Sequence, residues 1–211
     1  MAILEDCPNG GFRGKVGSVY GYNLNGKWVI RGSRRKSSKP PTHAQLTHRE
    51  KMKLAGKFCG WIKPIVNFGY QFEESKKSGL GKFQLAQQQI LKNAIDLDVE
   101  NRPVINMEKV QVFVGELMSP EGVEARWEDD LLKLHWIPNP KYRDSTFKLN
   151  LALVSLDREG DLKMAIADAW QGECTVEIPR FKMDKFDYHV YIGFWDTYQG
   201  VLSNSTYCGV I

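Results

Sequence analysis

Apolar and polar positions follow two different periods along this chain of 211 residues. From about residue 107 onward apolar residues alternate with polar ones, which is the period of a half-buried β-strand. Between residues 42 and 95 apolar residues instead recur every three or four positions, as they do on one face of an α-helix. The pattern predicts an α+β fold with helices in the middle of the chain and antiparallel strands after them.

The alternating part of the chain, residues 101–211, is predicted to form a β-sandwich domain. Its seven strand segments lie at 110–117, 122–127 or 131–136, 147–156, 161–168, 173–179, 188–195 and 205–210. This number and spacing are typical of an immunoglobulin-like or fibronectin-like β-sandwich. The Cys…Trp…Cys pattern of antibody domains is missing, so the prediction concerns the sandwich geometry alone.

Helical spacing predicts a two-helix segment over residues 42–100. The first helix begins with a capping-box pair, carries an apolar stripe over 52–62 and ends or kinks at Pro64. A second helix is predicted over 83–95. The pattern at 65–72 fits either a short helix or an extended segment, and both alternatives stay open.

Before the helices, residues 1–41 are predicted to form a β-hairpin followed by a basic arm. Residues 15–22 and 27–31 are rich in strand-forming side chains, and Asn25-Gly26 between them is the dipeptide that a type I′ turn prefers. The arm, 31–41, has no hydrophobic period and ends in two prolines. Because a two-stranded ribbon is only marginally stable alone, we expect the hairpin to pack on another part of the chain or on a neighbouring subunit.

Charge is distributed unevenly along the chain. Residues 1–60 hold 12 Lys and Arg against 3 Asp and Glu, a net charge of about +9, whereas residues 101–211 hold 12 against 17, a net charge of about −5. Residues 61–100 are neutral, with 5 of each sign. A basic head and an acidic, strand-rich tail favour binding of a polyanion or of the tail of another copy.

The sequence gives little sign of catalytic chemistry. It lacks the motifs of serine hydrolases, of P-loop and dinucleotide-binding proteins and of zinc proteases. His43 and His48 are five positions apart rather than the four that bring two imidazoles to one metal, while His135 and His189 stand alone in predicted strands. Glu128 begins an acidic cluster that fits a solvated turn. We therefore expect a protein that is not an enzyme and that uses no metal and no cofactor.

The four cysteines lie far apart, which favours reduced, structural thiols. No segment reaches the roughly 18 to 20 apolar residues that a membrane helix needs, and the first residues do not resemble a signal peptide. These features predict synthesis in the cytoplasm without a signal peptide and without a membrane span. Incorporation into a virion or an extracellular particle is left open.

The candidate contact residues are the aromatic side chains of the hairpin and the cations around and after it. Dense cations neutralise phosphates or pair with an acidic protein surface, and aromatic rings stack on unpaired bases or pack on another subunit. The candidates for assembly or polyanion contact are Tyr20, Tyr22, Trp28, Arg31, Arg34, Arg35, Lys36, Lys39 and Arg49.

Several sequence blocks, in the order in which they occur, resemble a known protein family. They are Gly14-Lys15-Val16-Gly17, Gly21-Tyr22, Gly26-Lys27-Trp28-Val29, Arg31, Thr42-x-Ala44-Gln45-x-x-x-Arg49 and Ser203-x-Ser205-x-Tyr207-x-Gly209. With these blocks nearly the whole chain resembles uncharacterised Bacteroidota proteins known by a domain of unknown function, a resemblance that implies no established activity. The Thr-x-x-Gln-x-x-x-Arg block is also similar to short segments of phage and prophage structural proteins, which implies a role in a virion or tail.

The leading hypothesis is a non-enzymatic structural subunit that self-assembles into a virion, a tail-like particle or a filament through its N-terminal hairpin and arm. Its partners would then be further copies in a homo-oligomer or filament. One alternative is a nucleic-acid-binding protein that uses the basic arm. Another is a surface carbohydrate- or protein-binding module that uses tryptophans near strand ends, namely Trp127, Trp136, Trp170 and Trp195.

Overall fold

The computed structural model of the protein divides into two compact units, Met1–Thr42 and His43–Ile211. It describes residues 2–4, 11–24, 26–34, 38–73, 79–128, 131–156, 160–178 and 187–211. Each unit is considered by itself below.

The N-terminal unit is a four-stranded antiparallel sheet with the strand order β1-β4-β3-β2. Its strands are β1 (Ala2–Leu4), β2 (Gly14–Val16), β3 (Val19–Leu24) and β4 (Lys27–Gly32). The predicted single strand over 15–22 is therefore wrong. Gly17 has a φ of +56°, a left-handed conformation that a strand residue does not adopt, and the chain turns there to pair β2 with β3.

The predicted turn between β3 and β4 is only partly described. Gly26 has a φ of +83°, and its N–H donates to Asn23 Oδ1 at 2.9 Å. Asn25, the other residue of the predicted turn, lies outside the described residues. The pairing of Leu24 with Lys27 fits the two-residue loop that the sequence predicts.

The larger unit begins with helices. They are α1 (His43–Trp61), α2 (Lys63–Gly69), α3 (Lys82–Gln89) and a π-helical turn, Ile90–Ala94. The first predicted helix agrees with α1, which ends just before Pro64. Pro64 lies in the first turn of α2, where no N–H is needed for an intrahelical bond, so the open segment 65–72 starts as helix.

Two sheets and a small hairpin complete this unit. The central sheet has the order β10-β9-β12, and β12 also pairs with the short strands β13 and β14; the outer sheet has the order β11-β8-β7. The bounds are β7 (Glu124–Glu128), β8 (Leu131–His135), β9 (Phe147–Val154), β10 (Asp161–Asp168), β11 (Glu173–Glu177), β12 (His189–Asp196), β13 (Val201–Leu202) and β14 (Thr206–Val210). The hairpin pairs β5 (Ile95–Leu97) with β6 (Pro103–Ile105), and single 3-10 turns lie at Met107–Lys109 and Pro140–Tyr142.

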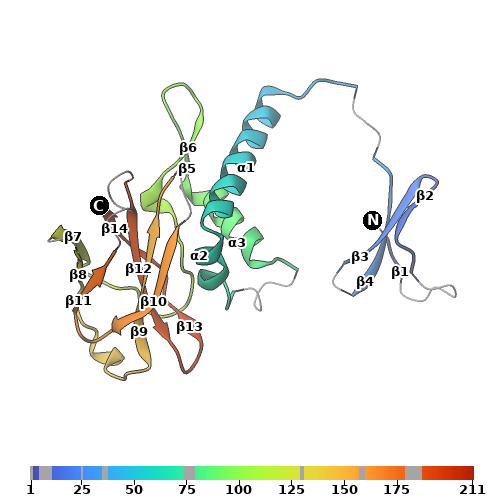
Figure 1. Cartoon of the computed structure of the whole chain (residues 1–211). Helices are drawn as coiled ribbons and strands as arrows, with labels where there is room; N and C mark the ends of the chain where they lie inside the picture. The colour runs from blue at the N-terminus through green and yellow to red at the C-terminus, as the bar shows by residue number, and fades with distance from the viewer. Residues whose placement is uncertain are drawn as a thin grey trace. The chain divides into compact units, whose positions relative to one another are not determined.

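The helices and the outer sheet lie on opposite sides of the central sheet (Figure 1). Ala152, Val154 and Tyr191 belong to a core that the central sheet shares with α1, α2 and α3. Leu151 and Ile192, which alternate with them along the strands, belong to a second core shared with the outer sheet. Because both faces of β9 and β12 are covered, these strands are apolar almost throughout. The α+β prediction is confirmed.

The predicted strand over 110–117 is wrong. Most of its apolar residues are buried, but the segment runs beside α2 and the β13–β14 break. It makes one isolated bridge, between Leu117 and Ser203, instead of joining a ladder. Its N–H groups donate to acceptors outside a ladder. The N–H of Val112 donates to Ser205 Oγ at 3.0 Å, and the N–H of Val114 donates to Gly69 O at 3.1 Å. Alternation here reflects burial, which does not require a strand partner.

Candidate functional site

Three of the predicted contact residues share one face of the N-terminal sheet. Tyr20 and Tyr22 are two positions apart on β3, and Arg31 lies directly opposite Tyr20 on β4. Side chains that are paired directly across a ladder point to the same face. The two tyrosine rings lie 6.2 Å apart, and the Arg31 guanidinium lies 6.0 Å from the Tyr22 ring centroid, at the limit of a cation–π contact.

By the same register, further residues belong to this surface, which we call the aromatic-basic face. Its members are Lys15, Tyr20, Tyr22, Leu24, Lys27, Val29 and Arg31. Val29 is buried, whereas Tyr20 is 43% and Leu24 49% exposed. The face therefore offers aromatic rings, an aliphatic side chain and cations together.

Trp28 is not part of this face. It pairs with Asn23, so its side chain points to the opposite side of the sheet. There residues 11 and 12 cross the strands: a Cβ on Gly11 would lie 1.9 Å from the Trp28 ring, and a Cβ on Gly21 would lie 2.5 Å from Phe12 O. The close approach requires glycine at both positions and gives Trp28 a packing role.

The remaining cations of the predicted site are dispersed. Arg34 and Lys39 are exposed in the segment after β4. Arg49 is exposed on α1 and so belongs to the larger unit. Arg35 and Lys36 lie outside the described residues. The structure thus brings together the hairpin members of the predicted site, apart from Trp28.

The four histidines and Glu128 are distributed over α1, β7, β8 and β12. Within the described part of the chain no group of three or more His, Cys, Asp or Glu side chains is arranged to hold a metal ion. His189 Nδ1 lies 2.9 Å from Tyr207 Oη, and burial lowers the pKa of His189 although the Asp187 carboxylate opposes this shift. Glu128 forms an ion pair with Lys133 at 2.7 Å. Asp129 and Asp130 lie outside the described residues.

Three cysteines are free thiols in the described residues. Burial raises the pKa of Cys59 to about 12, that of Cys174 to about 11 and that of Cys208 to about 12. Thiols with such pKa values stay protonated at neutral pH and are poor nucleophiles. Cys7 lies outside the described residues.

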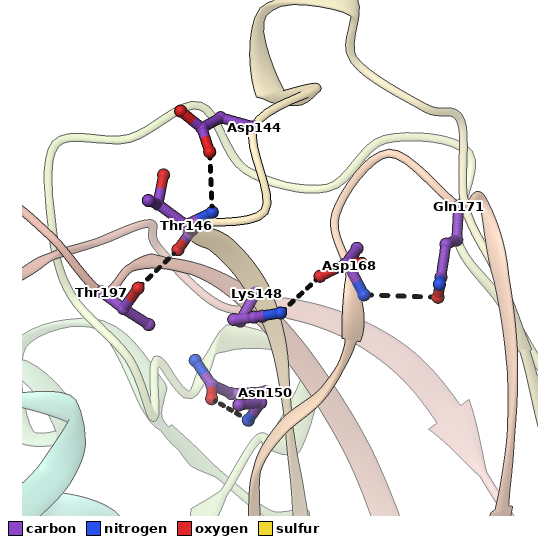
Figure 2. Close-up of polar contacts among 8 residues, drawn as sticks. Asp144, Thr146, Lys148, Asn150, Asp168, Gln171 and Thr197 are labelled. Carbon is purple, nitrogen blue, oxygen red and sulfur yellow. Dashed lines mark hydrogen bonds and ion pairs between the residues drawn. The ribbon is translucent and has the colours of Figure 1, made fainter.

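A polar row that the sequence did not suggest crosses the helix-facing side of the central sheet. Figure 2 shows Lys148 on β9 pointing toward Asp168 on β10, with Lys148 Nζ and Asp168 Oδ1 2.6 Å apart. Asn150 follows Lys148 two residues later on the same face of β9. Asn150 Oδ1 accepts the N–H of Ala165 at 2.9 Å, where β10 bulges. Asn150 Nδ2 and the nearby Trp195 Nε1 are buried and have no hydrogen-bond partner within the described protein. The row holds the bulge, and its lysine ammonium and aspartate carboxylate are paired with each other.

The four tryptophans that the sequence assigned to strand ends have different environments. Trp136 is fully buried, and Trp127 packs against the same core from its edge. Trp195 is half-buried and meets Phe68 edge to face, with ring centroids 5.5 Å apart. Trp170 alone among the four is exposed, at 48%. Sequence hydrophobicity could not distinguish the buried tryptophans from the exposed one, because it does not reveal which strand end faces a core.

Together these features define an α+β protein in which a small sheet with an aromatic-basic face precedes a larger unit of helices and two sheets. None of the helices in the described residues is long and apolar enough to cross a membrane. The chain belongs to a family of unknown function (DUF6266), whose model matches residues 11–209. The match covers most of both units. It confirms the predicted family resemblance, and no curated protein matches the chain.

The family match does not bear on two parts of the sequence-based resemblance. The Bacteroidota origin and the short similarity to phage and prophage proteins stay predictions. The pattern residues do have structural roles in the larger unit: Ser203 Oγ accepts the buried N–H of Phe194 at 2.8 Å, and Ser205 Oγ accepts that of Val112. Residues of these blocks therefore serve, in part, to hold the fold of this chain.

Proposed function

We propose that the protein is a non-enzymatic structural subunit that assembles with further copies of itself through its N-terminal sheet. The observation that carries this proposal is how few side chains are buried among the described residues of that unit. Among its described side chains only Val29 is buried, while Val16 is 60%, Leu24 49% and Tyr20 43% exposed. A small sheet gains most of its stability by burying one face, so this unit is suited to a partner surface.

The outer edge of β2 supports the same proposal. In the described residues β2 pairs only with β3, so its other edge presents backbone donors and acceptors. Such an edge can accept a strand from a second molecule, with the backbone hydrogen bonds setting the register. The β2 edge of one molecule would contact the larger unit of the next molecule. Such a contact joins two different surfaces, so it is head to tail and would give a ring or an open filament.

Charge supports another copy as the partner. The N-terminal segment is strongly basic, whereas residues 101–211 carry 17 acidic against 12 basic side chains. Opposite charges speed encounter and fix orientation more than they add affinity. The assembly proposed here, a virion, a tail-like particle or a filament, would therefore form faster at low salt. The immunoglobulin-like or fibronectin-like geometry of the two sheets in the larger unit is a further part of the proposal.

The test compares Val16→Lys with Val99→Lys. Val16 lies on the open edge strand β2, and Val99 is a fully exposed valine in the larger unit. Light scattering and negative-stain microscopy over a range of concentration and salt should show assemblies of the wild-type protein and of Val99→Lys. Val16→Lys should weaken association about tenfold or more. A wild-type protein that stays monomeric throughout would overturn the proposal.

Nucleic-acid binding is a second candidate, favoured by the aromatic-basic face. Aromatic rings next to cations form the usual surface for single strands, and each stacked base contributes about 1–3 kcal/mol. Tyr20→Ala should then weaken binding of a labelled oligonucleotide, measured by fluorescence anisotropy at several salt concentrations. Tyr198→Ala, which removes an 86% exposed tyrosine of the larger unit, is the control. Absence of binding at low salt would eliminate this candidate.

A further inference from the structure

The turn between β10 and β11 presents a tryptophan to solvent on a rigid support. Trp170 is 48% exposed. On either side of it the backbone is fixed: the Trp136 indole N–H donates to Ala169 O at 2.7 Å, and the Trp136 backbone N–H donates to Gly172 O at 2.8 Å. The N–H of Gln171 also donates to Asp168 O at 3.1 Å. Burying Trp136 thus anchors the turn, while its neighbour Trp170 makes no comparable contribution to the core.

A second rigid segment faces this turn. Pro138, Asn139 and Pro140 lead into a 3-10 turn, in which Asn139 Oδ1 accepts the N–H of Lys141 at 3.0 Å and Asn139 O accepts that of Tyr142 at 2.9 Å. The two segments approach closely. Gly172 has a φ of +81°, and a Cβ there would lie 2.8 Å from the Pro138 ring. Only glycine fits both the backbone conformation and this spacing.

Between the two segments lies an open groove of about 490 Å³, lined by Pro138, Asn139, Pro140, Arg143 and Trp170. Its volume is in the range of small-ligand sites. Arg143 is exposed and has no acidic partner among the described residues, so it contributes an uncompensated positive charge. The groove combines one flat aromatic ring, two proline rings and one guanidinium.

We propose that this groove binds an acidic saccharide, with a sugar ring stacked on the Trp170 indole and its carboxylate paired with Arg143. An indole ring offers a large flat apolar surface, which matches the C–H face of a pyranose. A guanidinium binds a carboxylate through two parallel N–H···O bonds. Because both walls are already fixed by internal hydrogen bonds, binding would order little of the protein.

A peptide fits the same groove less well. An extended peptide binds by adding a strand to a free sheet edge, but the groove is built from turns whose amide N–H groups at Trp136, Tyr142 and Gln171 are already donated within the protein. A proline-rich peptide requires an aromatic-lined groove. Here Trp170 is the one aromatic residue that lines the groove. A saccharide needs only the single platform and the charge.

The test uses the full-length protein and isothermal titration calorimetry with three probes: a galacturonic acid trisaccharide, a neutral glucose trisaccharide and hexaglutamate. The proposal expects the acidic saccharide to bind more tightly than the other two. Trp170→Ala should weaken this binding about tenfold or more, and Trp170→Phe should weaken it less because a ring remains. Arg143→Gln should abolish the preference for the acidic over the neutral saccharide. Lys141→Ala removes a cation of the same turn that does not line the groove, and it should bind as the wild type does.

Several outcomes would overturn the proposal. One is no binding of the acidic saccharide to wild-type protein whose circular dichroism shows that it is folded. Unchanged binding by Trp170→Ala would place the site elsewhere. Equal binding of hexaglutamate would indicate a general polyanion surface, and equal loss in Lys141→Ala would indicate that charge alone is responsible. None of these outcomes depends on whether the N-terminal sheet mediates assembly.

Discussion

Asn150 and Ala165 show how one side chain can hold an unusual backbone. Ala165 has a φ of +51°, a left-handed conformation that costs an alanine about 1–2 kcal/mol. Its N–H has lost its ladder partner at the bulge in β10 and is accepted by the buried Asn150 side chain. The Asn150 side-chain oxygen therefore takes the place of the backbone acceptor that a neighbouring strand would provide.

Replacing Asn150 by Ala should destabilise the protein by about 1–3 kcal/mol, because a fully buried side chain and its hydrogen bond to the N–H of Ala165 would both be lost. Ala165→Gly should have the opposite sign and stabilise it by up to about 1 kcal/mol, since glycine adopts this φ freely and loses part of the gain to chain entropy. Urea denaturation followed by circular dichroism measures both effects. Two shifts of the same sign would show that the bulge is not held in this way.

His189 should make stability depend on pH. Burial lowers its pKa in the folded protein below the roughly 6.5 of an unfolded chain, so the unfolded state takes up the proton more readily. The stability contributed by neutral His189 is present above about pH 6.5 and is lost as the pH falls toward the folded pKa. We expect the thermal midpoint to fall between pH 7 and pH 5. This fall should be smaller in His189→Gln.

His135→Gln is the matched control, because His135 is an exposed strand histidine. It should keep the wild-type slope. The carboxyl groups of Asp96 and Asp98 do not interfere in this window. Hydrogen bonds from the Lys109 side chain and the Arg102 backbone lower their pKa values below the ordinary carboxyl range. An unchanged slope in His189→Gln would show that the fall has another origin.

At this scale the sequence identified residue types better than it identified neighbours. Tyr20, Tyr22 and Arg31 were predicted to act together, and the ladder brings them to one face. Trp28 was grouped with them by composition, but a two-residue loop pairs it with Asn23 and turns it to the other side. Arg143 had no sequence signal, since its role depends on a groove formed with Trp170, 27 positions along the chain.

At the scale of elements, the chain that returns beside β12 forms two short strands, β13 and β14, in place of one continuous strand. β13 pairs with one end of β12 and β14 with the other. In the gap, Ser203 Oγ accepts the N–H of Phe194 at 2.8 Å and donates to Asn204 O at 2.9 Å. A buried serine thus supplies the acceptor that a continuous strand would have provided.

Ser203→Ala should therefore cost about 1–3 kcal/mol, because the N–H of Phe194 would remain buried without its acceptor. Ser38→Ala, at an exposed position before α1, should change stability by less than about 0.5 kcal/mol. Differential scanning calorimetry can compare the two variants with the wild type. A cost near zero for Ser203→Ala would mean that the N–H finds another acceptor.

Element positions were predictable where local pattern and tertiary pairing agree. The helix after residue 42 and the strand over 161–168 follow from periodicity and turn residues alone. The segments 122–127 and 131–136 were predicted as alternatives for one strand, whereas the structure has a strand in each, β7 and β8. The segment 110–117 was misassigned because burial by a helix gives the same alternation as burial by a sheet. The division of 15–22 depends on one glycine whose left-handed φ no hydrophobic pattern reveals.

For the whole molecule, the division at residue 42 implies that the larger unit is stable by itself. Residues 43–211 contain both hydrophobic cores. A protein limited to these residues should show the main calorimetric transition within about 3 °C of that of the full chain. It should also lose the salt-dependent association proposed above. Aggregation of this shortened protein, or a much lower transition, would show that the N-terminal sheet supports the larger unit.

The bulge in β10 and the break between β13 and β14 have a consequence for aggregation. Both occur in the strands that border the central sheet, where a regular edge would recruit strands from any unfolded neighbour. The border strands of the outer sheet, β7 and β11, begin and end with glutamate, which repels a like edge. The larger unit is thus guarded against indiscriminate polymerisation. The edge strands of the N-terminal sheet, β1 and β2, have no register shift and no glutamate, and the single charge on β2 is that of Lys15. If copies join by strand addition, growth would begin at the N-terminal sheet of each molecule and leave the larger unit outside the ladder.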